Sequence, residues 1–279
     1  MSGAVLEGAP QAELDEGPVT VPRRVLARGA AARTVLAPVV FGVVFLGLWQ
    51  LLVVALRIEQ FIVPSPLAIW GEFVDNLPFV FDASVRTGAN ALVGLVVGTL
   101  VGVLAAIVSS VWRLADSLGA PLVAALSVMP IVALAPVLYS MFGAGVETAR
   151  QLVAALAVLI PVYLNTLRGL RQVRPVHRDL MQVYAASARQ QQLAVTLPTA
   201  APYLFTGLRI ASSLAVISAL VAEYFGGPSG GLGKAITSAA SSSDYTLAWA
   251  YVLGSILLGL LFYCAALAVE TWSTRHQPT

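Results

Sequence analysis

Long apolar segments are the feature of this sequence that most restricts its fold. A helix needs roughly 20 mostly apolar residues to cross the hydrocarbon core of a bilayer, which is about 30 Å thick. Six segments approach or exceed this length: Leu36–Leu56, Thr87–Trp112, Ser117–Val146, Gln151–Leu167, about Leu204–Phe225 and Tyr245–Val269. The chain is 58% hydrophobic and 11% charged, whereas soluble proteins carry about 25% charged residues. The sequence therefore predicts an all-α integral membrane protein with about six transmembrane helices.

The third segment, Ser117–Val146, is uncharged but contains Pro121, Pro130 and Pro136. Proline removes a backbone donor, and in lipid the carbonyl groups that this frees need other partners. The segment is therefore either one long kinked span or one span with an adjoining short helix. In both cases we expect it to be buried among the other helices rather than to face lipid.

The positive charges indicate which ends of the spans face the cytoplasm, because lysine and arginine are favoured in cytoplasmic loops. With both termini inside, twelve of the 16 lysine and arginine residues lie on the inner side. The four on the outer side are Arg57, Arg86, Arg150 and Lys234. We therefore expect cytoplasmic termini, outer segments at 57–86 and 226–244, and one large inner loop at 169–203.

The ends of the chain lie outside the apolar segments. The first thirty residues are polar, low in aromatics and without the apolar core of a signal peptide. We predict a flexible cytoplasmic tail at 1–33, a transmembrane domain at 34–273 and a cytoplasmic tail at 274–279.

The inner loop is predicted to contain a short amphipathic helix. Pro175 suits the first turn of a helix, and residues 179–194 are mostly good helix formers. Pro198 and Pro202 are then expected to end or redirect the chain. Such a helix is either a rigid knob that a cytoplasmic partner grips or an interfacial helix on the lipid surface. Small residues interrupt its apolar face, which favours close packing against protein.

This loop resembles the EAA loop of ABC importer permeases, in which E-A-A-x-x-x-G is followed at a fixed interval by L-P. Counting back from Leu197-Pro198 places Asp179 at the family's glutamate, Ala185 at its glycine and Ser187 at its common serine. The chain then reads L-P-x-A-x-P-Y-x-x-x-G-L-R up to Arg209, a continuation typical of the nitrate/sulfonate/taurine-type importer permeases.

Three further stretches resemble the same family. They are V-P-S-P at 63–66, M-P-I-V-A-L-A-P-V-L at 129–138, and V-A-E-Y-F-G-G at 221–227 followed by G-L-G at 231–233. The resemblance covers about residues 36–272, so only the ends of the chain lie outside it.

The resemblance implies a type I ABC importer (MetI-like) permease fold with a cytoplasmic coupling helix, in a bacterial inner membrane. It implies ABC ATP-binding subunits, an extracytoplasmic substrate-binding protein and a second copy of the permease as partners, besides membrane lipids. ATP and Mg²⁺ are expected to bind to the ATPase, so this chain is not expected to be an enzyme or to hold a cofactor. The residues that the resemblance assigns to ATPase coupling are Asp179, Val183, Tyr184, Ala185, Ala186, Ser187 and Pro198.

Catalytic and metal-binding patterns are missing from the sequence. The stretch Pro228–Ala235 comes nearest to a phosphate-binding loop, but it lacks the first glycine and the final hydroxyl of that motif. We interpret it as a flexible outer turn. The chain has one cysteine and two histidines that lie far apart, so no Cys/His metal site is expected, and a net charge of +2 suggests no nucleic-acid partner.

Polar residues within membrane spans are costly and often mark a transport path. Arg209 and Glu223 lie near opposite ends of the fifth segment, where we expect their side chains to snorkel to the interface. Asn90 and Asn165 are interpreted as hydrogen-bond links between helices, and G-x-x-x-G at 94–102 as a close packing face. The tentative substrate pathway comprises Met129, Pro130, Tyr139, Asn165 and Glu223, with a purely structural kink as the alternative for the prolines.

Two other classes are weighed on the residues alone. An ion-coupled secondary carrier should show inverted repeats or ionisable residues near the midplane, and we find neither. A membrane scaffold without transport leaves the loop pattern unexplained. For an importer, a small organic nitrogen compound such as a thiamine-precursor pyrimidine is the expected substrate. Sulfonates, taurine, nitrate and riboflavin-like compounds are the alternatives.

Overall fold

The computed structural model describes residues 28–274, with side-chain surroundings for residues 36–273. The predicted tails at 1–33 and 274–279 therefore fall almost wholly outside the described residues. The exceptions are residues 28–33, in the first turns of the first helix, and Thr274, at the end of the last helix. The chain divides into two units, Met1–Leu48 and Trp49–Thr279, and each is described by itself.

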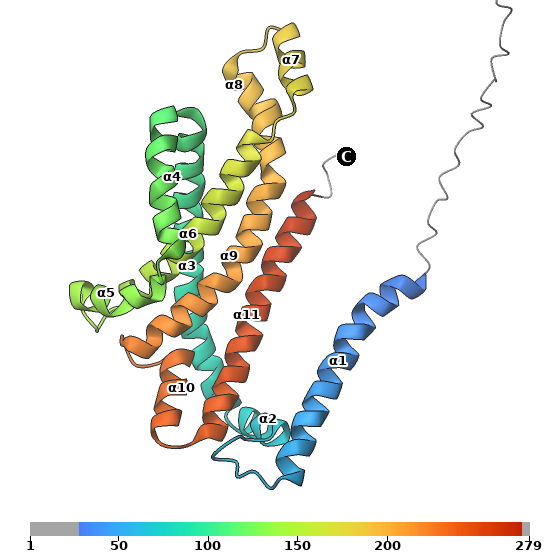
Figure 1. The fold of residues 1–279 in the computed structure, drawn as a ribbon. Coiled ribbons are helices and arrows are strands. Elements are labelled where there is room, and N and C mark those ends of the chain that lie inside the picture. Colours follow the sequence, from blue (N-terminus) through green and yellow to red (C-terminus); the bar gives the residue numbers. More distant parts are fainter. Residues whose placement is uncertain (1–27, 275–279) are drawn as a thin grey trace, which may run out of the picture. The chain divides into compact units, whose positions relative to one another are not determined.

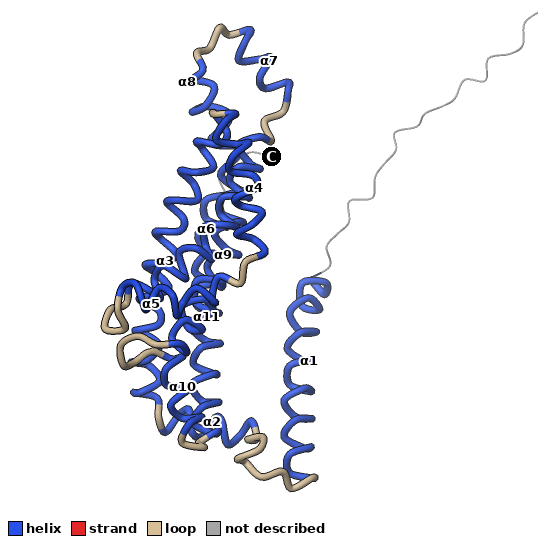
Figure 2. The backbone as a smooth tube through the Cα atoms, turned by 60° about the vertical axis from the view of Figure 1, so that its left-hand side comes forward, coloured by secondary structure: helices blue, strands red, loops and turns tan. Residues whose placement is uncertain are grey.

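Every regular element in the described residues is a helix (Figure 2). In chain order the elements are α1 (Arg28–Ala55), α2 (Pro66–Asp75), α3 (Leu77–Val111), α4 (Arg113–Val128), the 3₁₀ turn η1 (Ile131–Leu134), α5 (Ala135–Phe142), α6 (Thr148–Arg171), α7 (Pro175–Val183), α8 (Ala188–Gln191), the π-helical turn η2 (Gln192–Thr196), α9 (Leu197–Phe225), α10 (Leu232–Ser241) and α11 (Tyr245–Thr274).

The prediction of about six spans is confirmed. Five helices among the described residues are long and apolar enough to cross a membrane, and the pair formed by Arg113–Val128 and Ile131–Phe142 makes a sixth if it counts as one span. The first of these spans, Leu36–Ala55, has a mean hydropathy of 2.3 and is almost entirely exposed. Such a helix is suited to lipid rather than to a protein core.

The core of the second unit is built on α3, α6 and α9. Gly94, Gly98 and Gly102 lie one turn apart on α3 and face α6, as the G-x-x-x-G pattern predicts. A Cβ atom at Gly98 would overlap the Ala155 carbonyl oxygen and lie 2.8 Å from Val158 Cβ. Glycine therefore lets the backbones of α3 and α6 approach closely. Small side chains of α6 and α9 fill the rest of this core.

The two ends of this helix bundle differ. The α7–α8 hairpin stands beyond one end of α6 and α9, whereas α10 and α2 lie at the opposite end (Figure 1). The helix α9 runs between the two ends. Any signal exchanged between them can therefore pass along one continuous helix.

The bent segment α4–η1–α5 is only partly buried within this chain. The two halves meet at 88° near Met129 and Pro130, so the segment is not one continuous helix. Most of its large apolar side chains are exposed, among them Leu118, Leu122 and Val128. Val123, Ala135 and Tyr139 are buried, so this chain by itself covers the segment only in part, and burial away from lipid stays a prediction.

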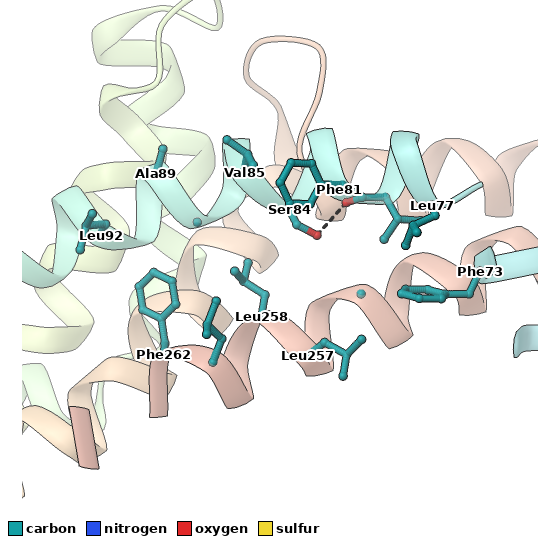
Figure 3. Close-up of a pocket in the computed structure, with 14 residues that line it drawn as sticks. Phe73, Leu77, Phe81, Ser84, Val85, Ala89, Leu92, Leu257, Leu258 and Phe262 are labelled. Carbon is teal, nitrogen blue, oxygen red and sulfur yellow. Dashed lines mark hydrogen bonds between the residues drawn. The ribbon is translucent and has the colours of Figure 1, made fainter. Parts of the chain in front are cut away.

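An apolar groove of about 550 Å³ lies between α3 and α11. Figure 3 shows that side chains such as Leu92, Leu258 and Phe262 line it. The Ser84 hydroxyl supplies a rare polar atom there, and it donates to the Val80 carbonyl of its own helix. The groove offers a polar solute nothing to bind and is suited to lipid chains.

We predict that Gly98→Ala destabilises the bundle by about 1–3 kcal/mol, the usual cost of inserting a methyl group into a packed core. Gly259→Ala is the matched control, because Gly259 lies in α11 with nothing within 4 Å of an added Cβ. Thermal unfolding of the purified proteins in detergent measures the difference. Equal midpoints for the two variants would contradict the close approach of α3 and α6.

Candidate functional site

The inner loop forms a helical hairpin rather than the single helix expected over 179–194. The helix α7 starts with Pro175 in its first turn and ends at Val183. A second helix, α8, starts at Ser187, whose hydroxyl accepts from Gln190 N while the Gln190 side chain accepts from Ser187 N at 2.8 Å. This capping box satisfies donors at a new helix N-terminus, which is why the helix predicted from propensity is interrupted. We refer to residues 175–191 as the α7–α8 hairpin.

The turn of the hairpin depends on a left-handed residue. Ala185 has a φ of 49°, a conformation that costs an L-amino acid roughly 1–2 kcal/mol and that glycine adopts freely. The resemblance places Ala185 at the position of the family's glycine. The chain therefore keeps the backbone conformation that the motif requires although it lacks the residue that favours it.

Apolar side chains of the hairpin point outward. Val183 is 82% exposed and Tyr184 is 74% exposed, and Leu180 and Val176 are also exposed. Of the residues assigned to coupling, Asp179, Ala185, Ser187 and Pro198 are exposed and Ala186 is half-buried. The hairpin thus presents a compact surface with apolar side chains at its tip, a pattern that marks protein contact sites.

The prolines after the hairpin do not end or redirect the helix, contrary to the prediction. Pro198 lies in the first turn of α9, and Pro202 lies within α9. The π-helical turn Gln192–Thr196 precedes Pro198 and widens the helix where the proline ring would otherwise meet the preceding carbonyls. As a result Ala188–Phe225 forms one helical run of 38 residues, about 57 Å long at 1.5 Å per residue. Because the hydrocarbon core is about 30 Å thick, this run extends well beyond it.

A buried ion-pair cluster lies near the other end of α9. It comprises Thr87 of α3, Tyr139 of α5, Glu147 and Arg150 at the start of α6, and Glu223 of α9. Arg150, Glu223 and Thr87 are fully buried, and Tyr139 is 7% exposed. The cluster therefore joins four helices through side chains that are buried, except for Glu147, which is partly exposed.

Arg150 is the centre of the cluster. Its Nη1 atom lies 2.9 Å from Glu147 Oε2 and 3.8 Å from Glu223 Oε1. Its Nε donates to the Tyr139 hydroxyl at 3.3 Å, and its Nη2 donates to the Pro228 carbonyl at 2.6 Å. The guanidinium thus has both charge and hydrogen-bond partners, which a buried arginine requires.

Glu223 receives donors from two other elements. The Thr87 hydroxyl lies within 2.9–3.0 Å of both carboxylate oxygens, and Gly233 N donates to Oε2 at 2.7 Å. Leu232 N donates to the Thr87 hydroxyl at 2.8 Å. Glu223 and Thr87 therefore satisfy backbone donors in the first turn of α10, where the partial positive charge of the helix favours a carboxylate.

Two interpretations of these residues are corrected. Glu223 does not snorkel, because its side chain is fully buried and paired. Pro228–Ala235 is not a flexible turn throughout, since Leu232 is fully buried and begins α10. No local pattern in the sequence signals the contacts of Glu223 with Thr87 and Arg150, because these two partners come from distant segments.

The remaining polar residues have other partners. Arg209 pairs with Glu270 of α11 at 3.1 Å, so an ion pair between helices replaces the expected snorkelling. Asn90 links α3 to the α6 end through Glu147 and Gln151, which confirms its interpretation as interhelical. Asn165 instead donates to the Pro161 carbonyl of its own helix.

The structure separates the residues of the tentative substrate pathway. Tyr139 and Glu223 come together in the ion-pair cluster, whereas Met129 and Pro130 lie exposed at the bend of α4–η1–α5. Asn165 is half-buried and apart from both. Their role as a path stays a prediction.

Comparisons with known proteins identify the class. Residues 98–274 match the family described as "Binding-protein-dependent transport system inner membrane component". The riboflavin transport system permease protein RibX of Chloroflexus aurantiacus is 33% identical over 82% of this chain and 85% of its own length. The formylaminopyrimidine transport permease protein ThiX of Halalkalibacterium halodurans is 27% identical over 84% of this chain and 93% of its own.

A solved structure supports the fold. One similar structure is the crystal structure of an amino acid ABC transporter with histidines. The similarity covers 71% of this chain and 95% of the transporter chain, with a TM-score of 0.59 and 15% sequence identity. The helical bundle with its projecting hairpin is thus that of a multi-pass ABC importer permease. The chain belongs to the family of binding-protein-dependent transport system inner membrane components and is a transmembrane permease subunit of an ABC importer.

We predict that breaking the central ion pair strongly destabilises the protein. Arg150→Met leaves the fully buried Glu223 carboxylate without a nearby cation, and removing one partner of a buried pair costs about 3–5 kcal/mol. The double variant Arg150→Met/Glu223→Gln should lose less stability than the sum of the two single variants, since no fully buried carboxylate is then left without a cation. Thermal unfolding in detergent measures all three.

Arg86→Gln is the control for this double-mutant cycle. It removes an arginine whose pair with Asp82 is exposed, and exposed pairs contribute little. Additive losses from Arg150→Met and Glu223→Gln would show that the two residues do not interact.

Proposed function

We propose that the α7–α8 hairpin docks on a separate ATP-binding subunit in the cytoplasm and that both termini of the chain are cytoplasmic. The observation that carries this proposal is the exposed apolar tip, Val183 and Tyr184, at the end of a helical run too long for the membrane. An interfacial helix would lay its apolar side chains in the lipid surface, whereas this hairpin stands beyond the bundle (Figure 1). The positive charges around the hairpin support the inner side.

ATP and Mg²⁺ bind to that partner, and this chain supplies no catalytic residue. ATP-driven closure of two ATP-binding subunits moves the hairpins, and the rigid α9 carries that movement into the membrane. An extracytoplasmic substrate-binding protein delivers the solute to the opposite end, where α10 and the ion-pair cluster lie.

A second copy of the permease completes the path. The bent segment α4–η1–α5 breaks the helical backbone at Met129 and Pro130, and most of its apolar side chains are exposed. In a membrane, such irregular backbone is tolerated only where protein covers it or where it lines a water-filled cavity. A symmetric partner that faces this segment provides both.

The proposed substrate is a small organic nitrogen compound of the N-heterocyclic class. The relatives named for riboflavin and for formylaminopyrimidine transport support this choice. Sulfonates are the second candidate, because the putative aliphatic sulfonates transport permease protein SsuC of Bacillus subtilis is 26% identical over 78% of this chain. An ion-coupled carrier is not favoured, because the family consists of subunits of binding-protein-dependent systems.

We predict that Tyr184→Asp abolishes stimulation of the ATPase partner by the loaded binding protein, because a carboxylate at the hairpin tip is poorly tolerated in an apolar contact. Ala185→Arg should do the same. ATP hydrolysis of the purified complex in proteoliposomes is the measurement.

One variant is a control for this prediction. Ala185→Gly relaxes the left-handed turn and should retain stimulation. Normal stimulation in both Tyr184→Asp and Ala185→Arg would remove the docking assignment.

For the substrate, we predict that riboflavin-like or pyrimidine compounds raise the melting temperature of the cognate binding protein. They should also drive ATP-dependent uptake into proteoliposomes that contain the whole importer. Stabilisation by taurine or alkanesulfonates alone would establish the second candidate. Uptake by this chain without an ATPase would instead indicate a secondary carrier.

A further inference from the structure

A basic pocket opens at the base of the α7–α8 hairpin, where α6 ends and α9 begins. Its volume is about 520 Å³. Unlike the apolar groove of Figure 3, it is lined mainly by side chains that donate hydrogen bonds. These side chains are Arg171, Gln172, Arg174, His177, Thr199 and Tyr203.

The pocket carries excess positive charge. Among the described residues, Asp116 pairs with Arg171 at 2.6 Å, but no acidic side chain pairs with Arg174. Arg168 and Arg178 flank the pocket in sequence, and Asp179 is the acidic residue that follows on α7. Arginine is the side chain best suited to bind a phosphate through two parallel hydrogen bonds.

The start of α7 adds little to the same place, because Pro175 has no N–H and His177 N donates to the Arg174 carbonyl at 3.0 Å. The cavity and the unpaired Arg174 are therefore the two features that suit one negatively charged group.

The depth of the pocket identifies the source of that group. The apolar part of α6 ends at Leu167, and Leu170 and Val173 are the last side chains buried in the bundle before the pocket. Thr199 and Tyr203 belong to the first two turns of α9. Tyrosine is enriched at the boundary between hydrocarbon and water, so the end of the apolar part of α6 and the presence of Tyr203 suit the level of lipid headgroups.

We propose that this pocket binds the phosphodiester of an anionic phospholipid. Arg174 and Arg171 hold the phosphate, His177 donates a hydrogen bond to it, and the Tyr203 ring contacts the glycerol. The lipid then joins α6, α7 and α9 at the base of the hairpin. Basic pockets between transmembrane helices on the cytoplasmic side are known to bind such headgroups.

The test uses the purified full-length permease in a neutral detergent. Dioleoylphosphatidylglycerol should raise its melting temperature, and dioleoylphosphatidylcholine should not. Arg174→Gln should raise the half-saturating phosphatidylglycerol concentration about fivefold. Its melting temperature in lipid-free detergent should be unchanged. Arg174→Lys, which keeps the charge but not the fork of donors, should lie between these values.

The matched control is Arg113→Gln, which removes an exposed arginine at the same end of the bundle outside the pocket. It should leave the phosphatidylglycerol response unchanged. Equal losses for Arg113→Gln and Arg174→Gln would overturn the proposal in favour of diffuse charge attraction. Equal stabilisation by inorganic phosphate would overturn it in favour of a soluble anion.

A second measurement distinguishes a lipid site from a protein contact. Native mass spectrometry should count bound phosphatidylglycerol on the permease and on its complex with the ATPase, with fewer lipids on Arg174→Gln in both. Loss of the bound lipid whenever the ATPase is added would overturn the proposal and assign the pocket to the protein interface.

Discussion

An arginine that is fully buried within a helical membrane protein needs charge and hydrogen-bond partners that no lipid supplies, and Arg150 sets this requirement for the whole bundle. Glu147, Glu223, Tyr139 and the Pro228 carbonyl together meet it. Since these groups come from α5, α6, α9 and the loop before α10, the helices cannot separate without leaving a buried charge unpaired. Thr87 extends the same requirement to α3 by bonding both Glu223 and the first turn of α10. The apolar contacts supply the bulk of the packing, but the cluster determines which helices must stay together.

The glycine face of α3 makes this arrangement possible. Because Gly94 and Gly98 bring α3 and α6 into backbone contact, the side chains at the ends of these helices come within hydrogen-bond distance of one another. Asn90, one turn from Gly94, bonds Glu147 and Gln151 at the start of α6. Close packing in the apolar interior and polar pairing at the end of the bundle are therefore two parts of one interface.

Hydropathy and motif spacing were sufficient for the spans, the hairpin position and the family, because each depends on residues that are close in sequence. The cluster could not be predicted in this way. Thr87 and Glu223 are 136 residues apart, and nothing local shows that they meet. Propensity also failed where a single local contact decides the outcome. The Ser187 capping box divides a segment of good helix formers, and the π-helical turn lets α9 continue through Pro198 and Pro202, where sequence rules predict a break.

The bundle thus combines a rigid end with a projecting one. At the cluster, polar groups are paired and buried, so a small displacement there breaks several contacts at once. The hairpin at the other end has exposed side chains and a strained Ala185, and little of the chain restrains it. The continuous helical run Ala188–Phe225 joins the two without an intervening loop, so under the proposed docking a force on the hairpin would act on Glu223 along a helix. Packed helices respond to such a force by moving as a block rather than by deforming.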